Sequence, residues 1–377
     1  MARLGDIFTI SSGGTPNKIE ASYYANGTIP WVKTGDLKDK YVPEGIECIT
    51  EEGLNNSSAK LFPKDTVLVA MYGATIGACS ILPYEAATNQ ACAAFLPCDD
   101  VIPEYLFYFL SGRKDQFIKD GVGGAQPNIS AGYLKNVKFE LVSLGEQQKV
   151  IDRLSKVDDF ISFRKQQLSK LDELVKSRFI ELFGDPQSNP YGYQYAKLSD
   201  IATYFNGLTY KPENVAEEGT IVLRSSNIQN SQLDFADTVR VDCAIKERLM
   251  VQENDILMCS RNGSAKLVGK VALIKDIQEP MSFGAFMMII RSQYFGYLMT
   301  YFQMDAFRQQ IKTGATTTIN QITGRMLDDI TIPLPPMALV DQFTAFVEQT
   351  DKSKLAIQKS LEKLETLKKA LMQKYFG

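Results

Sequence analysis

The strongest constraint on how this chain folds is a helical stripe of residues that occurs twice. In the first copy, ten positions follow one another at alternating gaps of four and three residues: Val150, Leu154, Val157, Ile161, Arg164, Leu168, Leu171, Val175, Arg178 and Leu182. This spacing keeps one face of a helix turned toward one partner, as in a coiled coil. Adding 193 to each number gives a second stripe in the same register: Phe343, Val347, Thr350, Lys354, Ile357, Leu361, Leu364, Lys368, Leu371 and Tyr375. A single stripe is typical of a surface helix, but a shared register over ten positions predicts two long helices with a common role.

The ends of the first helix are also marked in the sequence. Ser143 and Glu146 form a capping-box pattern, which predicts that the helix starts there. Gly184 and Pro186 predict its end. About 39 residues at roughly 1.5 Å each give a helix of about 58 Å. A helix of that length cannot be buried on all sides in a domain of this size, so we expect it to act as a spacer.

The segment before this helix has the pattern of a mixed α/β domain. Short apolar runs rich in β-branched or aromatic residues predict strands, at Thr28–Lys33, Thr66–Met71, Ile76–Leu82 and Ala91–Leu96. Pro103 opens an apolar helical stretch, as proline does in a first helical turn. The glycine-rich, polar stretch 121–130 predicts an exposed loop.

The segment after Pro186 repeats the first one. Residues 3–7 (Arg-Leu-Gly-Asp-Ile) match residues 197–201 (Lys-Leu-Ser-Asp-Ile), and Gly-Thr-Ile recurs at 27–29 and 219–221. Offsets of 192 to 194 over the half-chain indicate one duplicated unit with pseudo-two-fold symmetry. The predicted fold class is therefore α/β (mixed α+β), with two similar globular domains and two long helices. The expected division is 1–142, 143–185, 186–335 and 336–377.

Composition narrows the class of function. The chain has no histidine, which removes Ser-His-Asp and Cys-His catalysis and the commonest ligand of catalytic zinc. Its net charge of −3 does not indicate a nucleic-acid binder, so any DNA-binding role must rest on local clusters of Lys and Arg. Six cysteines without a CxxC pair indicate free thiols in a reducing cytoplasm. No apolar run approaches the roughly 18 residues of a membrane span, so no membrane partner is expected.

Taken over its whole length, the chain resembles the specificity subunit of type I restriction-modification systems. The resemblance rests on two divergent globular domains that alternate with two long similar helices, and on the stretch Leu182-Phe183-Gly184-Asp185-Pro186 at the exit of the first helix. It implies that each globular domain is a target-recognition domain for one half of a split, asymmetric site in double-stranded DNA. It also implies that the helices pack antiparallel, set the spacing and dock two methyltransferase subunits. S-adenosylmethionine and the catalytic residues would then belong to the methyltransferase, and a separate motor-nuclease subunit would cut DNA. The chain itself would be non-catalytic, without a cofactor or metal, and cytoplasmic.

Polar loops that differ between the repeats are the candidates for base reading. Arg can bond guanine O6 and N7 with two hydrogen bonds, and Asn or Gln can do the same to adenine N6 and N7. The predicted DNA-binding residues of the first domain are Lys33, Thr34, Tyr72, Thr75, Gln126 and Asn128. Those of the second domain are Arg224, Ser225, Asn227, Arg261, Asn262, Thr317 and Asn320. On the helices, the charged stripe positions Arg164, Arg178, Lys354 and Lys368 either place long stems at the edge of the seam or face a partner protein.

Two alternatives remain open from the sequence. Asp36 and Lys38 could form the tail of a nuclease carboxylate-lysine motif, although the second repeat has Asn227-Ile228-Gln229 there. The chain would then be a stand-alone enzyme acting on DNA. The other alternative is a coiled-coil assembly adaptor that binds only protein.

Overall fold

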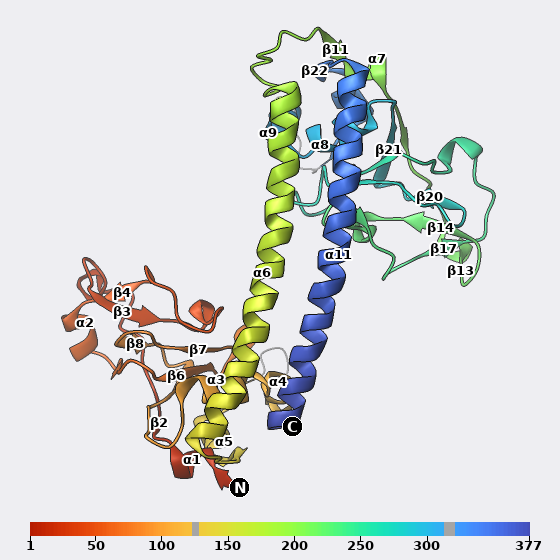
Figure 1. The fold of residues 1–377 in the computed structure, drawn as a ribbon. Coiled ribbons are helices and arrows are strands. Elements are labelled where there is room, and N and C mark those ends of the chain that lie inside the picture. The colour runs from red at the N-terminus through yellow and green to blue at the C-terminus, as the bar shows by residue number, and fades with distance from the viewer. Residues whose placement is uncertain (123–127, 313–320) are drawn as a thin grey trace. The chain divides into compact units, whose positions relative to one another are not determined.

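The computed structural model describes residues 1–122, 128–312 and 321–377 (Figure 1). It forms two compact units. The first unit combines Met1–Lys165 with Lys359–Gly377, and the second unit is Gln166–Gln358. Each unit therefore holds one globular domain and one part of each long helix. Three predicted site residues, Gln126, Thr317 and Asn320, lie outside the described residues.

The two long helices are confirmed, and their limits follow the sequence signals. Helix α6 runs from Leu144 to Phe183 and helix α11 from Met337 to Phe376. Before α6, the Ser143 backbone N–H donates to the Glu146 carboxylate at 3.2 Å, and the Glu146 N–H donates to Ser143 Oγ at 3.3 Å. These are the two bonds of a capping box. Gly184 ends α6 with φ of 75°, the left-handed conformation that glycine adopts most easily.

The helices pack together antiparallel in one register. In the second unit, Lys354 Nζ lies 2.7 Å from an oxygen of Asp172, and in the first unit, Lys368 Nζ lies 2.6 Å from an oxygen of Asp158. Lys368 follows Lys354 by fourteen residues on α11, whereas Asp158 precedes Asp172 by fourteen residues on α6. Equal and opposite steps are expected of antiparallel helices in a single register. All ten positions of each stripe are buried or half-buried. The 4–3 spacing therefore does mark the contact face, as predicted.

In the first unit, two four-stranded sheets form among the described residues. One is antiparallel and has the order β2 (Ile10–Ser12), β9 (Cys92–Phe95), β6 (Val67–Ala70) and β7 (Cys79–Ile81). The other has the order β4 (Cys48–Ile49), β3 (Ile29–Val32), β8 (Ala86–Thr88) and β5 (Leu61–Phe62), with β3 parallel to β8. A short pair, β1 (Ala2–Arg3) and β10 (Lys138–Phe139), joins the start of the domain to its end. The short helices are α1 (Leu4–Ile7), α2 (Glu51–Asn55), α3 (Pro103–Ser111), α4 (Lys114–Asp120) and α5 (Ala131–Asn136). All four strands predicted in this segment are confirmed, as is Pro103 at the start of a helix.

The layers of the first unit follow from side-chain alternation along β6. Val67 and Val69 belong to the cluster that packs against the helices, whereas Leu68 and Ala70 belong to the cluster shared with the second sheet. Successive side chains of a strand point to opposite faces, so this strand is buried on both. The sheet containing β6 thus lies between a helical layer and the other sheet.

The second unit repeats the topology of the antiparallel sheet, but in its mixed sheet the fourth strand lies on the opposite edge. Its antiparallel sheet has the order β12 (Thr203–Asn206), β21 (Met287–Arg291), β18 (Ile256–Cys259) and β19 (Val271–Leu273). Its mixed sheet has the order β13 (Val215–Ala216), β17 (Arg240–Val241), β14 (Thr220–Leu223) and β20 (Met281–Phe283), with β14 parallel to β20. Two further pairs are β11 (Tyr195–Lys197) with β22 (Thr331–Pro333), and β15 (Ile228–Gln229) with β16 (Gln232–Leu233). The short helices are α7 (Leu198–Ile201), α8 (Phe295–Tyr301), α9 (Asp305–Lys312) and α10 (Gly324–Asp328).

The ends of the long helices complete the core of each unit. In the first unit, the Phe376 ring of α11 lies 5.9 Å from that of Phe109 in α3. In the second unit, the Phe183 ring of α6 lies 5.0 Å from that of Tyr297 in α8. The matching Phe-Gly endings therefore mark the points where each helix enters a globular core. No helix among the described residues is long and apolar enough to cross a membrane.

Candidate nucleic-acid interface

A short turn follows the parallel strand of the mixed sheet in both units. After β3, Lys33 leads into a 3-10 turn at Thr34–Asp36, and after β14, Arg224 leads into one at Ser225–Asn227. The third residue of each turn accepts a hydrogen bond from the backbone N–H of the cation that precedes it. The donor–acceptor distance is 2.8 Å for Asp36 Oδ2 and 2.8 Å for Asn227 Oδ1. Asp36 therefore has a structural role that Asn227 shares, which counts against Asp36 as a nuclease carboxylate.

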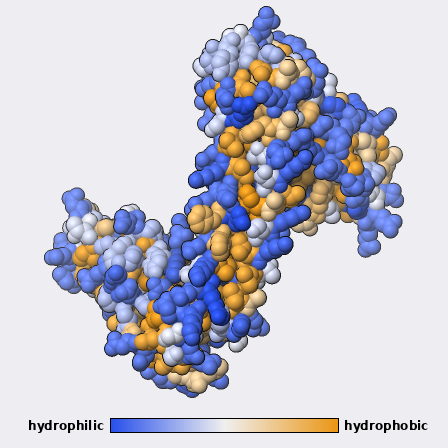
Figure 2. Space-filling model, viewed as in Figure 1, coloured by the Kyte–Doolittle hydropathy of each residue, from blue (hydrophilic) through white to orange (hydrophobic). Residues whose placement is uncertain are grey.

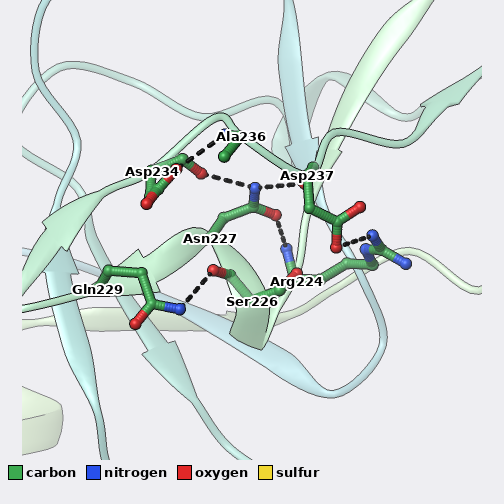
Figure 3. Close-up of polar contacts among 7 residues, drawn as sticks. All are labelled: Arg224, Ser226, Asn227, Gln229, Asp234, Ala236 and Asp237. Carbon is green, nitrogen blue, oxygen red and sulfur yellow. Dashed lines mark hydrogen bonds and ion pairs between the residues drawn. The ribbon is translucent and has the colours of Figure 1, made fainter. Parts of the chain in front are cut away.

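Asn227 is fully buried and all of its amide groups are used inside the chain (Figure 3). Its Nδ2 donates to the carbonyl oxygen of Asp234 at 2.8 Å and to that of Asp237 at 2.9 Å. A buried polar group satisfied in this way holds a loop together. The sequence placed Asn227 among the base-reading residues, but the structure assigns it to the fold because no part of its amide is free to meet a base.

The cations that start these turns are paired with carboxylates. Lys33 Nζ lies 2.6 Å from Glu47 Oε2, and Arg224 Nη2 lies 2.8 Å from Asp237 Oδ2. The hydrogen bond to Glu47 raises the pKa of Lys33. Glu47 and Asp237 each follow their cation by 14 and 13 residues, in the connection that leads to the next antiparallel strand. Both pairs are partly exposed, so they orient the side chains and contribute little to stability.

Each unit has a second loop of interest. In the first unit it begins at Met71 and lies beside the segment before α5, and in the second unit it begins at Ser260 and lies beside the segment before α10. The N–H of Ile129 donates to the Met71 carbonyl at 3.0 Å, and the N–H of Ile322 donates to the Ser260 carbonyl at 2.7 Å. The structure thereby brings together pairs that the sequence left apart: Tyr72 with Asn128, and Arg261 with Gln321, each as an isolated antiparallel bridge. Gln321 was not among the predicted site residues.

The two loops meet in the second unit. Asn262 Nδ2 donates to Ser225 Oγ at 3.2 Å, so three predicted residues, Ser225, Arg261 and Asn262, share one surface. In the described part of the first unit, no side-chain hydrogen bond joins Lys33 or Thr34 to the Tyr72 loop. There, Thr75 Oγ1 donates to the Tyr72 carbonyl at 3.4 Å and so fixes the turn that carries Tyr72.

The sequence reasoning missed a third element, the connection between the two sheets. Asn89 N–H donates to the Val32 carbonyl, and Gly284 N–H donates to the Leu223 carbonyl, both at 2.9 Å. Residues 89–91 and 284–286 therefore lie beside the turns at Thr34–Asp36 and Ser225–Asn227. The carbonyls of residues 91 and 286 also accept hydrogen bonds from the second loop of their unit, from the N–H groups of Met71 and Ser260. This segment exposes Gln90 in the first unit and Phe286 in the second, where 59% of the Phe286 residue is accessible.

A signal for this connection was present in the sequence. Gly13 and Gly207 are 194 residues apart, the offset of the neighbouring repeat match. A Cβ on Gly13 would lie 1.9 Å from the Thr88 carbonyl oxygen, and one on Gly207 would lie 2.2 Å from that of Gly284. Glycine at both places is required by close backbone approach to the end of β8 or β20.

The charged stripe positions are engaged within the helix pair. Besides the bonds of Lys354 and Lys368 described above, Arg178 lies 2.8 Å from Glu181 and its guanidinium lies 5.9 Å from the Phe346 ring centre. Arg164 is half-buried and also interacts within the chain. The aliphatic stems therefore cover the seam, and the charged groups bind partners within the chain. This favours the prediction that these residues lie at the edge of the seam over the prediction that they face a partner protein.

The helix surface that remains exposed is partly apolar. In Figure 2, hydrophobic residues gather over the two long helices. The large apolar side chains exposed on α6 and α11 are Leu144, Phe160, Phe163, Leu174, Ile180, Leu355 and Leu367. Phe160 and Phe163 are three residues apart and so lie on the same side of their helix. Large apolar side chains exposed next to each other, as Phe160 and Phe163 are, are typical of a protein interface.

Comparison with known proteins matches this architecture to one family. The family model described as "Type I restriction modification DNA specificity domain" matches twice, at residues 1–173 and 190–369. The chain is 25% identical over 406 residues to the specificity subunit of the type I restriction enzyme MjaIX of Methanocaldococcus jannaschii, covering 99% of this chain and 91% of that protein. It is 25% identical over 181 residues to the specificity subunit of Escherichia coli EcoR124I/EcoR124II, covering 47% of this chain and 45% of that one.

Solved structures show the same fold. The S subunit of the type I restriction-modification system of M. genitalium aligns over all of this chain and 95% of its own length, with a TM-score of 0.56 and 15% identity. A chain from a structural study of complex assembly and conformational transition of the type I R-M system aligns over all of this chain and 96% of its own, with a TM-score of 0.61 and 16% identity. With two copies of the family domain and a full-length match, this chain belongs to the family of type I restriction-modification specificity subunits, the non-catalytic components that recognise the DNA target.

Proposed function

We propose that each globular domain reads one half of a bipartite, asymmetric site in double-stranded DNA. The observation that carries this proposal is the matched placement of divergent polar residues on duplicated turns: Lys33 and Tyr72 stand where Arg224 and Arg261 stand in the second unit. A shared backbone frame with different side chains is suited to reading different bases, since base-edge contacts specify sequence.

The proposed reading surfaces follow from these positions. The first uses Lys33, Thr34, Tyr72, Thr75 and Asn128, together with Gln126 outside the described residues. The second uses Arg224, Ser225, Arg261 and Asn262, together with Thr317 and Asn320 outside the described residues. Asn227 leaves the set because its amide is consumed inside the fold.

We propose that the helix pair sets the separation of the two half-sites. Under this proposal the functional parts are 1–142 and 186–335 for recognition, and 143–185 and 336–377 for spacing. About 40 residues at roughly 1.5 Å each give a helix of about 60 Å, and two recognition modules linked in this way gain affinity by bivalency.

We further propose that the complex contains two methyltransferase subunits, which supply S-adenosylmethionine and the catalytic residues, and motor-nuclease subunits, and that it works in the cytoplasm. The exposed apolar residues of α6 and α11 support a protein partner on the helices. Because Lys354, Lys368 and Arg178 are engaged within the chain, we assign the docking contacts first to Phe160 and Phe163, and only secondarily to the charged stripe positions.

The half-site proposal predicts separable effects of two matched substitutions. Tyr72→Ala should relax the first half of the motif and Arg261→Ala the second, each leaving the other half unchanged. Loss of a base contact by Arg261 should cost about 1–3 kcal/mol of specific binding. The measurement is methylome sequencing of a host that carries the complex with each variant.

Arg248→Ala is the control, because Arg248 is an exposed arginine of the same domain outside these loops, in the turn Glu247–Leu249. It should leave both halves of the motif intact. Relaxation of both halves by either single loop variant would contradict a one-domain, one-half-site arrangement.

A further inference from the structure

Arg261 differs from the other cations of the proposed reading surfaces. Lys33 and Arg224 each hold a carboxylate within 3 Å. Among the described residues, no carboxylate lies within ion-pair distance of the Arg261 guanidinium, and the residue is exposed. A cation that no neighbour neutralises retains its full capacity to bond an outside acceptor.

Arg261 lies over an aromatic ring instead. The centre of its guanidinium is 5.3 Å from the centre of the Phe286 ring, within the range of a cation–π contact. The backbone ties the two residues together as well, because the N–H groups of Ser260 and Arg261 both donate to the Phe286 carbonyl, at 3.0 and 3.1 Å. Phe286 is 59% exposed, so this ring is not there to fill a core.

This pairing restricts where a guanidinium can go. A guanidinium held over an aromatic ring has fewer positions open to it, while its N–H groups can still bond an outside acceptor. Part of the conformational entropy that this long side chain would lose on binding a ligand is therefore lost before binding. The neighbouring Asn262 is held by Ser225, so the loop that presents Arg261 is tied at a second point.

We infer that Phe286 is a positioning residue that holds Arg261 ready to read a guanine in the second half-site. This inference rests on the proposed function. Two edge N–H groups of one planar guanidinium match the O6 and N7 acceptors of guanine in the major groove. At the matching positions of the first unit this pair is replaced, since Tyr72 stands in place of Arg261 and Ala91 in place of Phe286. Only the second half-site should therefore depend on it.

The test uses the full chain purified with its methyltransferase partner, and duplexes in which each guanine of the second half-site is replaced in turn by 7-deazaguanine, which lacks N7. The unmodified chain should lose about 5- to 150-fold in affinity at one such guanine, the range expected when a bidentate base contact is broken. Arg261→Ala should lose this sensitivity. Phe286→Ala and Phe286→Leu should reduce it at the same guanine, whereas Phe286→Tyr, which keeps the ring face, should preserve it.

Two controls separate positioning of Arg261 from other effects of the Phe286 substitutions. The double variant lacking both side chains should behave like Arg261→Ala alone, because Phe286 acts through Arg261. Phe286→Leu retains apolar volume, and an unchanged thermal midpoint shows that its effect is not one of folding.

Two outcomes would overturn the inference. If Phe286→Leu and Phe286→Ala keep the full sensitivity to 7-deazaguanine, Phe286 does not position Arg261. If Arg261→Ala weakens binding to every duplex equally and lowers the salt slope by about one, Arg261 contacts a phosphate. Either result leaves the bipartite motif in place, whereas failure of the proposed function would appear as an unmodified complex without any bipartite motif.

Discussion

At the scale of single residues, the matching turns of the two units use a carboxylate in one case and an amide in the other to accept the same backbone hydrogen bond. Asp36 and Asn227 both accept the backbone N–H that starts their turn, but only Asn227 also donates, to two backbone carbonyls. Asp36 is half-buried and only has to accept a hydrogen bond, so a carboxylate is adequate there. Asn227 is fully buried, where a carboxylate would face two carbonyl oxygens.

This difference predicts unequal tolerance of the reciprocal exchanges. Asn227→Asp should lower the free energy of unfolding by about 1–3 kcal/mol or more, because two backbone carbonyls lose their donor and a charge enters the buried position of Asn227. Asp36→Asn should change it by less than about 1 kcal/mol, since Asn and Asp serve equally well as acceptors at such positions. Denaturant unfolding of the two variants measures this. Equal destabilisation would contradict the structural role assigned to Asn227.

At the scale of elements, the start of α6 is anchored to the first globular domain by one buried amide. Gln147 is fully buried, and its Nε2 donates to the carbonyl oxygens of Asp100 at 2.8 Å and Val142 at 2.9 Å. Its Oε1 accepts the Ile102 N–H at 2.9 Å, directly before α3. The equivalent position in α11 is Val340, which is buried without polar groups. The anchor therefore belongs to one repeat only.

Gln147→Val, which installs the residue of the other repeat, should destabilise the chain by about 1–3 kcal/mol, because three part-buried hydrogen bonds to the backbone are lost. Gln148→Val is the matched control, because Gln148 is the exposed neighbour and its side chain donates to Asp152 on the surface. It should shift stability by no more than about 0.5 kcal/mol. Thermal unfolding of both variants provides the comparison, and similar shifts would show that the anchor is dispensable.

At the scale of the whole molecule, the duplicated unit gives two globular domains and an antiparallel helix pair. In each unit the core is closed by the start of one long helix and the end of the other, so neither globular domain is complete without both. A change of length in one helix alone therefore disturbs the register of the pair, whereas an equal change in both preserves it.

The proposed spacer role predicts that insertion of one heptad in both helices alters the preferred separation of the half-sites. A heptad adds about 10.5 Å, equivalent to about three base pairs at roughly 3.4 Å each. Insertion in one helix only should instead lower stability, because the two stripes would be shifted by one heptad along the pair and the helix ends could not all keep their core contacts. Methylome sequencing reads the separation directly, and an unchanged separation after a tolerated paired insertion would refute the spacer.

Regular, local features could be predicted from the sequence because neighbours in the chain determine them. The stripe from Val150 to Leu182, the Ser143–Glu146 cap and the Phe-Gly endings sufficed to predict both long helices, their limits and the duplication. The candidate loops were chosen from their divergence over a repeated frame, and their role in base reading stays a prediction. The family resemblance drawn from this order of elements was confirmed by comparison.

Which side chains within those loops are available was decided only by the tertiary structure. Asn227 is consumed by carbonyls seven and ten residues away, Lys33 is paired with a carboxylate fourteen residues away, and Arg261 meets Phe286 across a sheet connection. Residue type alone cannot separate these three fates, because each depends on a partner that folding brings near. The sequence by itself thus determined the repeated helices and their register through short-range periodicity. Folding decided which polar side chains remain free to meet DNA, because burial and pairing are long-range properties of the chain.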